Sequence, residues 1–340
     1  MNNYDWKTER KRGQNLFIVE GNHEKNKFLN LLFSAFPEIG IHKEDVMIYG
    51  TNIYQLYEDI IKFYDEEWNL EDIDLPYIVS KKIRNEQTLY KEDFVNIILV
   101  FDYERHDHNF SEEKIEKLQA YFGEMTDVGK LFLNYPMIES YQDLDAPIDP
   151  EYANRYVLAE MENGSDYKNS VNSKPIHKAM RLPTKIRELL SDRFEISGLE
   201  WLENFTNGLL QCKSIEELEI EIDTSLSSVL EMKKFLTAKN QLIKTIEAVK
   251  YLDLKVSYHV YIRELFNQII CQNIAKANKI QGGAYEDELE KVIECFQGMD
   301  LKKVLDEQNK SSQRIGGGII WVLNTSVFII PEYNLKLLET

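Results

Sequence analysis

The sequence predicts an α/β fold in which an N-terminal parallel sheet is followed by a largely helical C-terminal region. In the first 145 residues, short apolar runs alternate with amphipathic stretches, whereas from about residue 151 apolar residues recur mainly at three- and four-residue spacing. The apolar runs are nearly continuous, as expected for strands that are buried on both faces of a parallel sheet. We therefore expect two domains, residues 1–150 and residues 151–340.

The N-terminal elements follow in order. Leu16–Val19 predicts the first strand, and the amphipathic residues 24–36 predict a helix after it. Val46–Tyr49 predicts a second short strand, and Asn52–Tyr64 predicts a helix because its apolar side chains fall on one face. An acidic segment containing Pro76 is expected to be a connector.

The strongest strand is NIILVFD, residues 96–102. Ser111 is expected to cap a helix over residues 112–122, because two glutamates follow it in the first turn. KLFLNYP, residues 130–136, predicts the next strand. Strands that alternate with helices in this way predict a parallel sheet covered on both faces.

The C-terminal region has a mainly helical pattern, unlike the alternating strands and helices predicted before it. The polar segment Asn163–Pro175 predicts a loop and a domain boundary. Helical spacing follows in four segments, which are residues 186–190, 199–210, 226–252 and 256–277. QGGAYEDE, residues 281–288, predicts a break before another helix, and the apolar residues 319–333 leave a strand and a buried helix equally open.

Composition limits the functional classes. The chain has 340 residues, 43% hydrophobic residues and a net charge of −18, which argues against a protein that coats nucleic acid through a broad basic surface. An enzyme that contacts nucleic acid through one local groove is not excluded. No apolar run is long enough to cross a bilayer, and the N-terminus lacks the apolar stretch of a secretory signal, so we expect a cytoplasmic protein without a membrane partner.

Carboxylates follow the two most distinct predicted strands. Glu20 ends the first strand, Asp102 ends the strongest one, and Glu104 follows two residues later. Because ligands of open α/β sheets bind at the carboxyl ends of the strands, these acids are expected to converge. A hard divalent cation, Mg²⁺ or alternatively Mn²⁺, would relieve their repulsion and could assist phosphoryl chemistry. The alternative is that each acid only caps a helix.

These residues also resemble a known family. FIVEGNHEKNKFL followed by IILVFDYE is similar to the Toprim domain of primases, topoisomerases, ribonuclease M5 and OLD-type nucleases, over roughly residues 14–145. The resemblance implies that Glu20 acts as general base or metal ligand, that Glu24 is a second acid, and that Asp102 and Glu104 occupy the positions of an aspartate pair. Glu104 departs from that pattern, since the family has aspartate there.

NYPMIESY adds Glu139 after the next strand, as a further metal ligand or as a cap of the segment that follows. Similar turns occur in OLD-like nucleases and in the small Toprim subunits that accompany ABC-type ATPases in PARIS-type antiphage systems. The resemblance therefore implies a Mg²⁺-dependent endonuclease acting on DNA or RNA, an antiphage effector regulated by a partner ATPase. Two alternatives remain: a ribonuclease M5-like RNA-processing enzyme, and a non-catalytic module that holds a metal.

A basic strip interrupts the acidic chain. It is expected to contact nucleic-acid phosphates, with a solvated helix face as the alternative, and consists of Lys174, Lys178, Arg181, Lys185 and Arg187. His106 and His108 could bind a transition metal or stand in solvent. The helical C-terminal half carries no catalytic motif, so we expect it to mediate assembly, either with an ATPase or with another copy of the chain.

Overall fold

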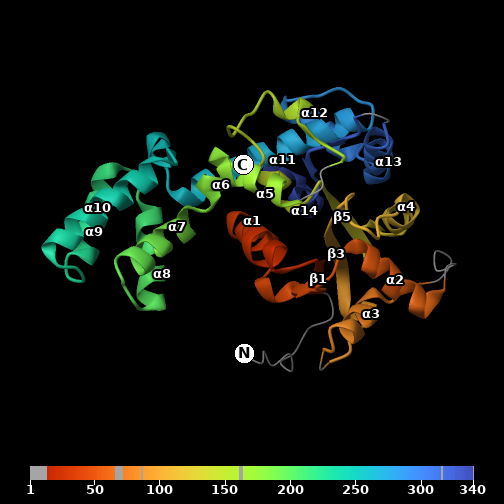
Figure 1. Ribbon diagram of the computed structural model, residues 1–340, viewed down its shortest axis with the longest axis horizontal. Coiled ribbons are helices and arrows are strands. Elements are labelled where there is room, and N and C mark those ends of the chain that lie inside the picture. The colour runs from red at the N-terminus through yellow and green to blue at the C-terminus, as the bar shows by residue number, and fades with distance from the viewer. Residues whose placement is uncertain (1–13, 66–71, 86, 161–163, 315–316, 340) are drawn as a thin grey trace. The chain divides into compact units, whose positions relative to one another are not determined.

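In the computed structural model of the chain, the described residues are 14–65, 72–85, 87–160, 164–314 and 317–339 (Figure 1). They form two compact units. The sheet unit comprises the described residues of 1–141, 150–165 and 269–340, and the helical unit comprises residues 142–149 and 166–268. The predicted class is confirmed at the level of a mixed α/β protein with a mostly parallel central sheet and a large helical content.

The compact units do not follow the predicted division at residue 150. Residues 269–340 return to the sheet unit, where β8 (Leu323–Asn324) pairs antiparallel with β5 (Gly129–Tyr135). In the same unit, α13 (Leu301–Ser312) packs against α4 (Glu112–Tyr121). The C-terminal residues thus complete the sheet unit and do not belong with the helical one.

The central sheet has the strand order β2-β1-β3-β5-β4, with β8 attached to β5. Its parallel part consists of β1, β2, β3 and β5, while β4 and β8 run antiparallel to β5. The strands not yet described span the following residues: β1 (Gln14–Val19), β2 (Val46–Ile48), β3 (Phe94–Asp102) and β4 (Gly123–Glu124). The described side chains of β1 from Leu16 and those of β3 from Ile97 onward are buried, as their continuous apolar runs predicted.

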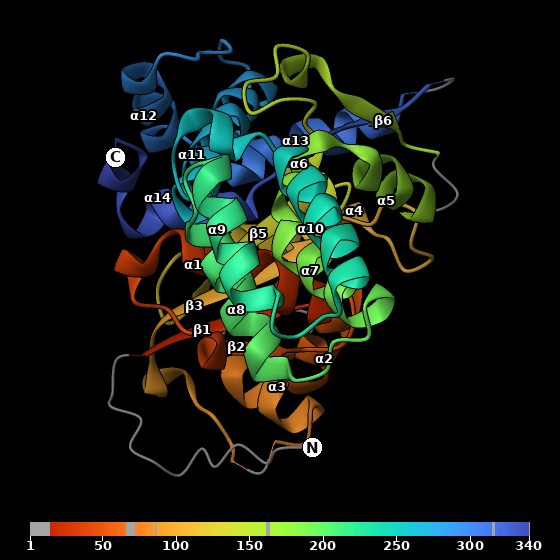
Figure 2. The same ribbon diagram turned by 90° about the vertical axis from the view of Figure 1, so that its left-hand side faces the viewer.

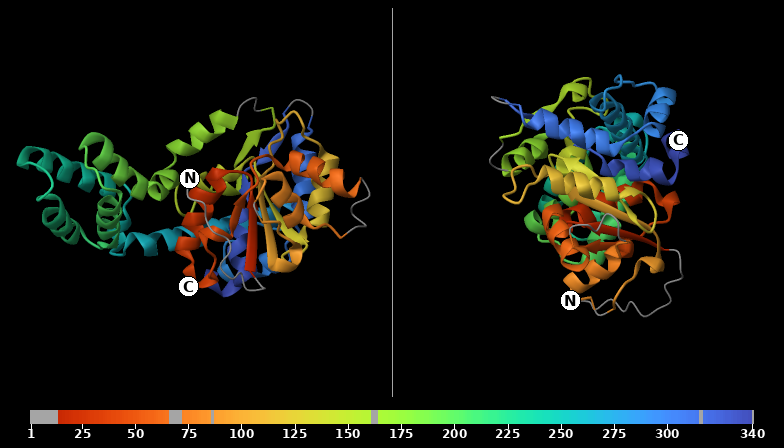
Figure 3. Two further views of the ribbon diagram at one scale, coloured as in Figure 1. Left: turned by 90° about the horizontal axis from the view of Figure 1, so that it is seen from below. Right: turned by 90° about the vertical axis from the view of Figure 1, so that its right-hand side faces the viewer.

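Helices cover both faces of this sheet. A π-helical turn (Glu24–Leu29) continues into α1 (Asn30–Ala35) on one face, and α2 (Ile53–Tyr64), α3 (Leu75–Lys82) and α4 lie on the other (Figures 1 and 3). Right-handed crossovers require this, because the chain moves one way from β1 to β2 and the opposite way from β2 to β3. The strand order therefore reverses between β1 and β3, which is the place where ligands of such sheets bind.

Local capping explains where these helices begin. The Asn52 side chain accepts from the Gln55 amide at 3.0 Å, and the Ser111 hydroxyl accepts from the Lys114 amide at 3.4 Å, so both predicted starts are confirmed. The expectation of a connector around Pro76 is wrong. Pro76 lies in the first turn of α3, where proline is tolerated because the amide it lacks would have had no partner there.

The helical unit is an array of short helices, in which α9 lies against both α8 and α10 (Figure 2). Its elements are α6 (Pro175–Met180), α7 (Leu182–Glu188), α8 (Leu199–Gln211), α9 (Ile215–Leu226) and α10 (Met232–Glu247), with most of α5 (Gly164–Ser173) and the first half of α11 (Tyr258–Ile280). None of the described helices is both long and apolar enough to cross a lipid bilayer.

Two predictions about this region are corrected. The expected loop Asn163–Pro175 is mostly the helix α5, because Tyr167 and Val171 lie four residues apart and are both buried; Asn163 itself is outside the described residues. The helix expected over residues 226–252 is shorter than predicted, because α9 ends at Leu226 and α10 covers only Met232–Glu247.

The C-terminal apolar segment combines both alternatives that the sequence left open. β7 (Ile319–Trp321) pairs antiparallel with β6 (Tyr156–Leu158), β8 follows it, and α14 (Ile329–Tyr333) ends the segment. The helix expected after the glycine-containing break is present as α12 (Leu289–Gln297).

Candidate carboxylate site

The reversal of strand order brings two acids to one edge of the sheet. Glu20 directly follows β1, and Asp102 is the last residue of β3. The two strands are parallel neighbours in which Val19 lies opposite Val100. Both carboxylates are therefore carried past the carboxyl end of the sheet from adjacent strands, at the switch point of the topology.

Asp102 is the most buried member of this pair, with only 5% of its surface exposed. Its Oδ1 atom is buried and has no hydrogen-bond partner among the described residues. Burial raises the pKa of Asp102 well above its usual value, and nearby negative charges raise it further. In order of decreasing effect, these charges are Glu20, Glu24, Glu139 and Glu104. The other four predicted carboxylates thus all lie within electrostatic range of Asp102.

Glu24 folds back onto the turn that follows β1. Its Oε2 atom accepts a hydrogen bond from the Gly21 amide at 2.8 Å. A β-carbon at Gly21 would lie 3.3 Å from that oxygen, so a side chain there would crowd the carboxylate. Lys25 donates to the carbonyl of Val46 at 2.5 Å and so joins the start of this helix to β2.

Glu139 is held in place by β8, whose last residue is Asn324. The Asn324 side chain donates to the Ile138 carbonyl at 2.9 Å and to the Ser140 hydroxyl at 3.2 Å, which fixes the residues on both sides of Glu139. The carboxylate is nearly fully buried, and its Oε1 atom lies 3.3 Å from Nδ1 of His23. His23 thereby connects the turn after β1 with the turn after β5.

The loop that carries Glu104 is anchored through its neighbour Tyr103. The Tyr103 carbonyl accepts from the Tyr54 hydroxyl at 2.5 Å, and the Tyr103 hydroxyl donates to Asn309 at 2.7 Å. Glu104 then adopts a φ of +38°, a conformation that non-glycine residues rarely adopt and that costs free energy. The strained residue Glu104 thus directly follows a residue that is anchored through both its carbonyl and its hydroxyl.

The donor set suits a hard cation in its chemistry, because carboxylate oxygens are the ligands that Mg²⁺ and Mn²⁺ prefer. The buried Oδ1 of Asp102 is an acceptor with no donor in the described part of the chain. Within that same part, however, no three or more His, Cys, Asp or Glu side chains are already arranged as a ligand group. Binding of a cation would therefore require the carboxylate side chains to rotate toward it.

The histidines of the following loop lie differently. His106 and His108 are exposed, and the Nδ1 atom of His108 lies 3.7 Å from Asp107. Asp107 itself accepts from the Asn52 side chain at 2.8 Å and from the Asn109 amide at 2.7 Å. Asp107 therefore organises this loop through its hydrogen bonds.

The basic strip belongs to the helical unit, and part of its charge is compensated there. Lys174 lies 2.8 Å from Asp145, while Arg181 lies 2.7 Å and Lys185 3.8 Å from Glu188. Two members, Lys178 and Arg187, have no ion pair among the described residues. The strip is therefore less uniformly available to phosphates than its sequence suggested.

Sequence reasoning missed two members of the carboxylate site. His23 stands inside the motif EGNHE, and its place between two acids was the available signal. Asn324 lies in an apolar segment 185 residues after Glu139, and nothing in its local sequence indicates that it holds that turn.

Comparison of the chain with known proteins found no matching family model, no matching curated protein and no matching solved structure. The resemblance to Toprim domains therefore stays a prediction that depends on the short motifs around Glu20 and Asp102.

Proposed function

We propose that the chain is a divalent-metal-dependent nuclease that hydrolyses phosphodiester bonds of DNA or RNA at the carboxylate site. The observation that carries the proposal is the state of Asp102. Its buried oxygen has no hydrogen-bond donor among the described residues, it ends a central strand at the switch point, and four glutamates add to its burial in raising its pKa. Such strongly perturbed groups are concentrated at functional sites.

The carboxylates of the site would have two roles, metal binding and proton transfer. Asp102 and Glu104 would hold a Mg²⁺ or Mn²⁺ ion, with Glu24 and Glu139 in support. When bound, such an ion stabilises charge on the phosphoryl oxygens and lowers the pKa of water. Glu20 would accept the proton of the attacking water at its carboxylate. The antiphage role and the partner ATPase stay predictions from the motif resemblance.

The first experiment is a cleavage assay with the purified full chain. Labelled single- and double-stranded DNA and RNA are incubated with Mg²⁺, with Mn²⁺ or with EDTA. We expect cleavage of at least one substrate in either metal, none in EDTA, and loss of cleavage in Asp102→Asn. Asp287→Asn is the matched control, because Asp287 is exposed and has no ion pair in the described part of the chain.

Each result has a consequence. Cleavage that persists in EDTA or in Asp102→Asn would contradict the proposal. A metal that raises the melting temperature without any cleavage would favour the non-catalytic module. Selective cleavage of structured cellular RNA by the purified chain would favour an RNA-processing enzyme over a regulated effector.

A further inference from the structure

The helical unit contains a large cavity that the carboxylate site does not use. Its volume is about 1130 Å³, and residues 145–147, α6, α7, the end of α10 and the start of α11 line it. Tyr258 fixes two of these walls together, because its hydroxyl donates to the carbonyl of Ala179 at 2.9 Å. The side chains of His177 and Gln142 are hydrogen-bonded at 2.7 Å, which holds the start of residues 142–149 against α6. The cavity thus has hydrogen-bonded walls.

The interior of the cavity is mainly apolar. Its wall includes Ile176, Ala179, Leu182 and Val249, and also Leu254, a large apolar side chain that is 61% exposed. A wall of this kind suits a flat apolar body and leaves little polar surface to orient it.

One polar group interrupts this wall. Tyr261 is 8% exposed as a residue, and its hydroxyl makes no hydrogen bond to the described residues and stays accessible to solvent. Its ring packs against those of Tyr251 and Tyr258 at centroid distances of 6.3 Å and 6.5 Å, which holds the hydroxyl in place. A hydroxyl that lines a cavity without a protein partner is available to hydrogen-bond a ligand there.

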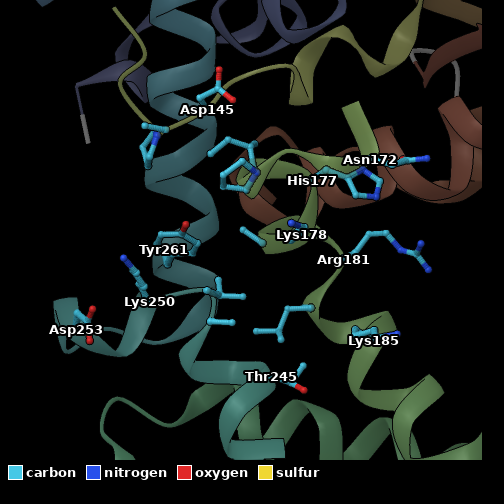
Figure 4. Close-up of a pocket in the computed structure, with 18 of the residues that line it drawn as sticks. Asp145, Asn172, His177, Lys178, Arg181, Lys185, Thr245, Lys250, Asp253 and Tyr261 are labelled. Atoms are coloured by element: carbon cyan, nitrogen blue, oxygen red, sulfur yellow. The ribbon is translucent and has the colours of Figure 1, made fainter. Parts of the chain in front are cut away.

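Two uncompensated cations flank the apolar wall. Lys178 comes from α6 and Lys250 from the turn after α10, and neither has an ion pair among the described residues. Figure 4 shows Lys250 and Tyr261 on one side of the cavity, with Arg181 and Lys185 on the other. The backbone of Lys250 has a φ of +64°, a conformation that favours glycine, yet the residue at this position is a lysine.

The acids of the lining change this balance little. Asp145 lies 2.8 Å from Lys174, and Glu188 lies 2.7 Å from Arg181, which leaves Asp253 as the lining acid without an ion pair in the described residues. In a chain of net charge −18, a cavity with an excess of positive charge is a local exception. Its ligand should therefore be anionic.

We infer that this cavity binds an unpaired nucleotide of a single-stranded nucleic acid, with the base against the apolar wall and the Tyr261 hydroxyl, and with the phosphates on either side near Lys178 and Lys250. A nucleotide within a strand has a planar apolar face, hydrogen-bonding edges and a phosphate on both its 5′ and 3′ sides. A fatty acid offers a single anionic end, and a base in a duplex cannot enter. The inference names the substrate class of the proposed nuclease and rests on that proposal.

The test measures binding without cleavage. The full chain is titrated against a labelled eight-nucleotide oligo(dT) or oligo(U) in EDTA, and fluorescence anisotropy is followed at several salt concentrations. We expect the double variant Lys178→Ala/Lys250→Gly to bind about 10-fold more weakly, with a salt slope reduced by about 1.4 for two lost phosphate contacts. Tyr261→Phe, which removes only the hydroxyl, should weaken binding about 3- to 10-fold.

These substitutions should leave the fold intact. Alanine is favourable in α6, and glycine suits the left-handed backbone of Lys250. Lys233→Ala is the matched control, because Lys233 is an exposed lysine of the same unit, outside the lining and without an ion pair in the described residues. It should bind like the unmodified chain.

Three outcomes would overturn the inference: unchanged binding by the double variant, an equal loss in Lys233→Ala, or a blunt duplex that binds as tightly as the single strand. A free mononucleotide that binds more tightly than the oligonucleotide would also overturn it, by assigning the cavity to a soluble nucleotide. Failure of the nuclease proposal alone would give another result: the strand would bind at the cavity in EDTA, but neither Mg²⁺ nor Mn²⁺ would produce cleavage.

Discussion

The Nδ1 atom of His23 lies 3.3 Å from the Oε1 atom of Glu139, and this contact joins the turn after β1 to the turn after β5. The side chain of Glu139 is 3% exposed and that of His23 is 28% exposed, so solvent screens the pair only in part.

A double-mutant cycle tests this contact. We expect His23→Gln and Glu139→Gln to show a coupling of about 0.5–1 kcal/mol in the free energy of unfolding at pH 6, because partly exposed ion pairs contribute little more. Urea unfolding of the four proteins measures it. Additive effects within error would show that the two side chains do not interact in solution.

The second prediction concerns pH. The pKa of Asp102 is raised above 3.8 in the folded chain, so between the two pKa values the folded state holds a proton that the unfolded state has released. The contribution of Asp102 to stability is therefore complete below pH 3.8 and is lost as pH rises through the folded-state pKa. We expect Asp102→Asn to be more stable than the unmodified chain at pH 7 without metal, because asparagine places no charge in this buried position.

The measurement is urea unfolding of both proteins at several pH values in EDTA. The difference between them should shrink toward pH 4, where the unmodified carboxyl is protonated in the folded state. A difference that is the same at every pH would contradict the raised pKa.

Mg²⁺ should reverse that order of stability. A ligand that binds only the folded chain stabilises it by about 2.7 kcal/mol at one hundred times its dissociation constant. We expect the melting temperature of the unmodified chain and of Asp287→Asn to rise with Mg²⁺ concentration, and that of Asp102→Asn to stay constant. An equal rise in Asp102→Asn would place the cation elsewhere.

Asn324 is far in sequence from the acidic motifs, but we expect it to contribute to both stability and catalysis. Asn324→Ala removes the donor to the Ile138 carbonyl and leaves that buried group unsatisfied, which should cost about 1–3 kcal/mol in the free energy of unfolding. It should also lower kcat more than it raises KM, because the turn that carries Glu139 loses its support. Asn207→Ala, at an exposed position in α8, is the control and should change neither quantity.

Much of the sheet could be predicted because its signals are local. Leu16–Val19 is an apolar run followed by Glu20, and residues 96–102 end in Asp102. Because strands that alternate with helices run parallel, both acids are expected at the same edge of the sheet. The cap at Ser111 could be predicted in the same way, since a capping side chain acts on an amide three residues away.

The rest depends on contacts between distant parts of the chain. β8 is two residues long and carries no periodic pattern, yet its pairing with β5 returns the C-terminus to the sheet unit. Polar α5 is a helix because Tyr167 and Val171 are buried, and a local propensity argument does not weigh such burial. Asn324 reaches Ile138 only in the folded chain.

The most direct test of the central claim is the single-turnover cleavage rate of Glu20→Gln in Mg²⁺, with enzyme in excess over a labelled strand that the unmodified chain cleaves. Loss of a general base predicts a rate at least about 100-fold lower. Strand affinity in EDTA and the far-UV circular dichroism spectrum should be unchanged. A rate equal to that of the unmodified chain would contradict the assignment of hydrolysis to the carboxylates at the end of β1 and β3.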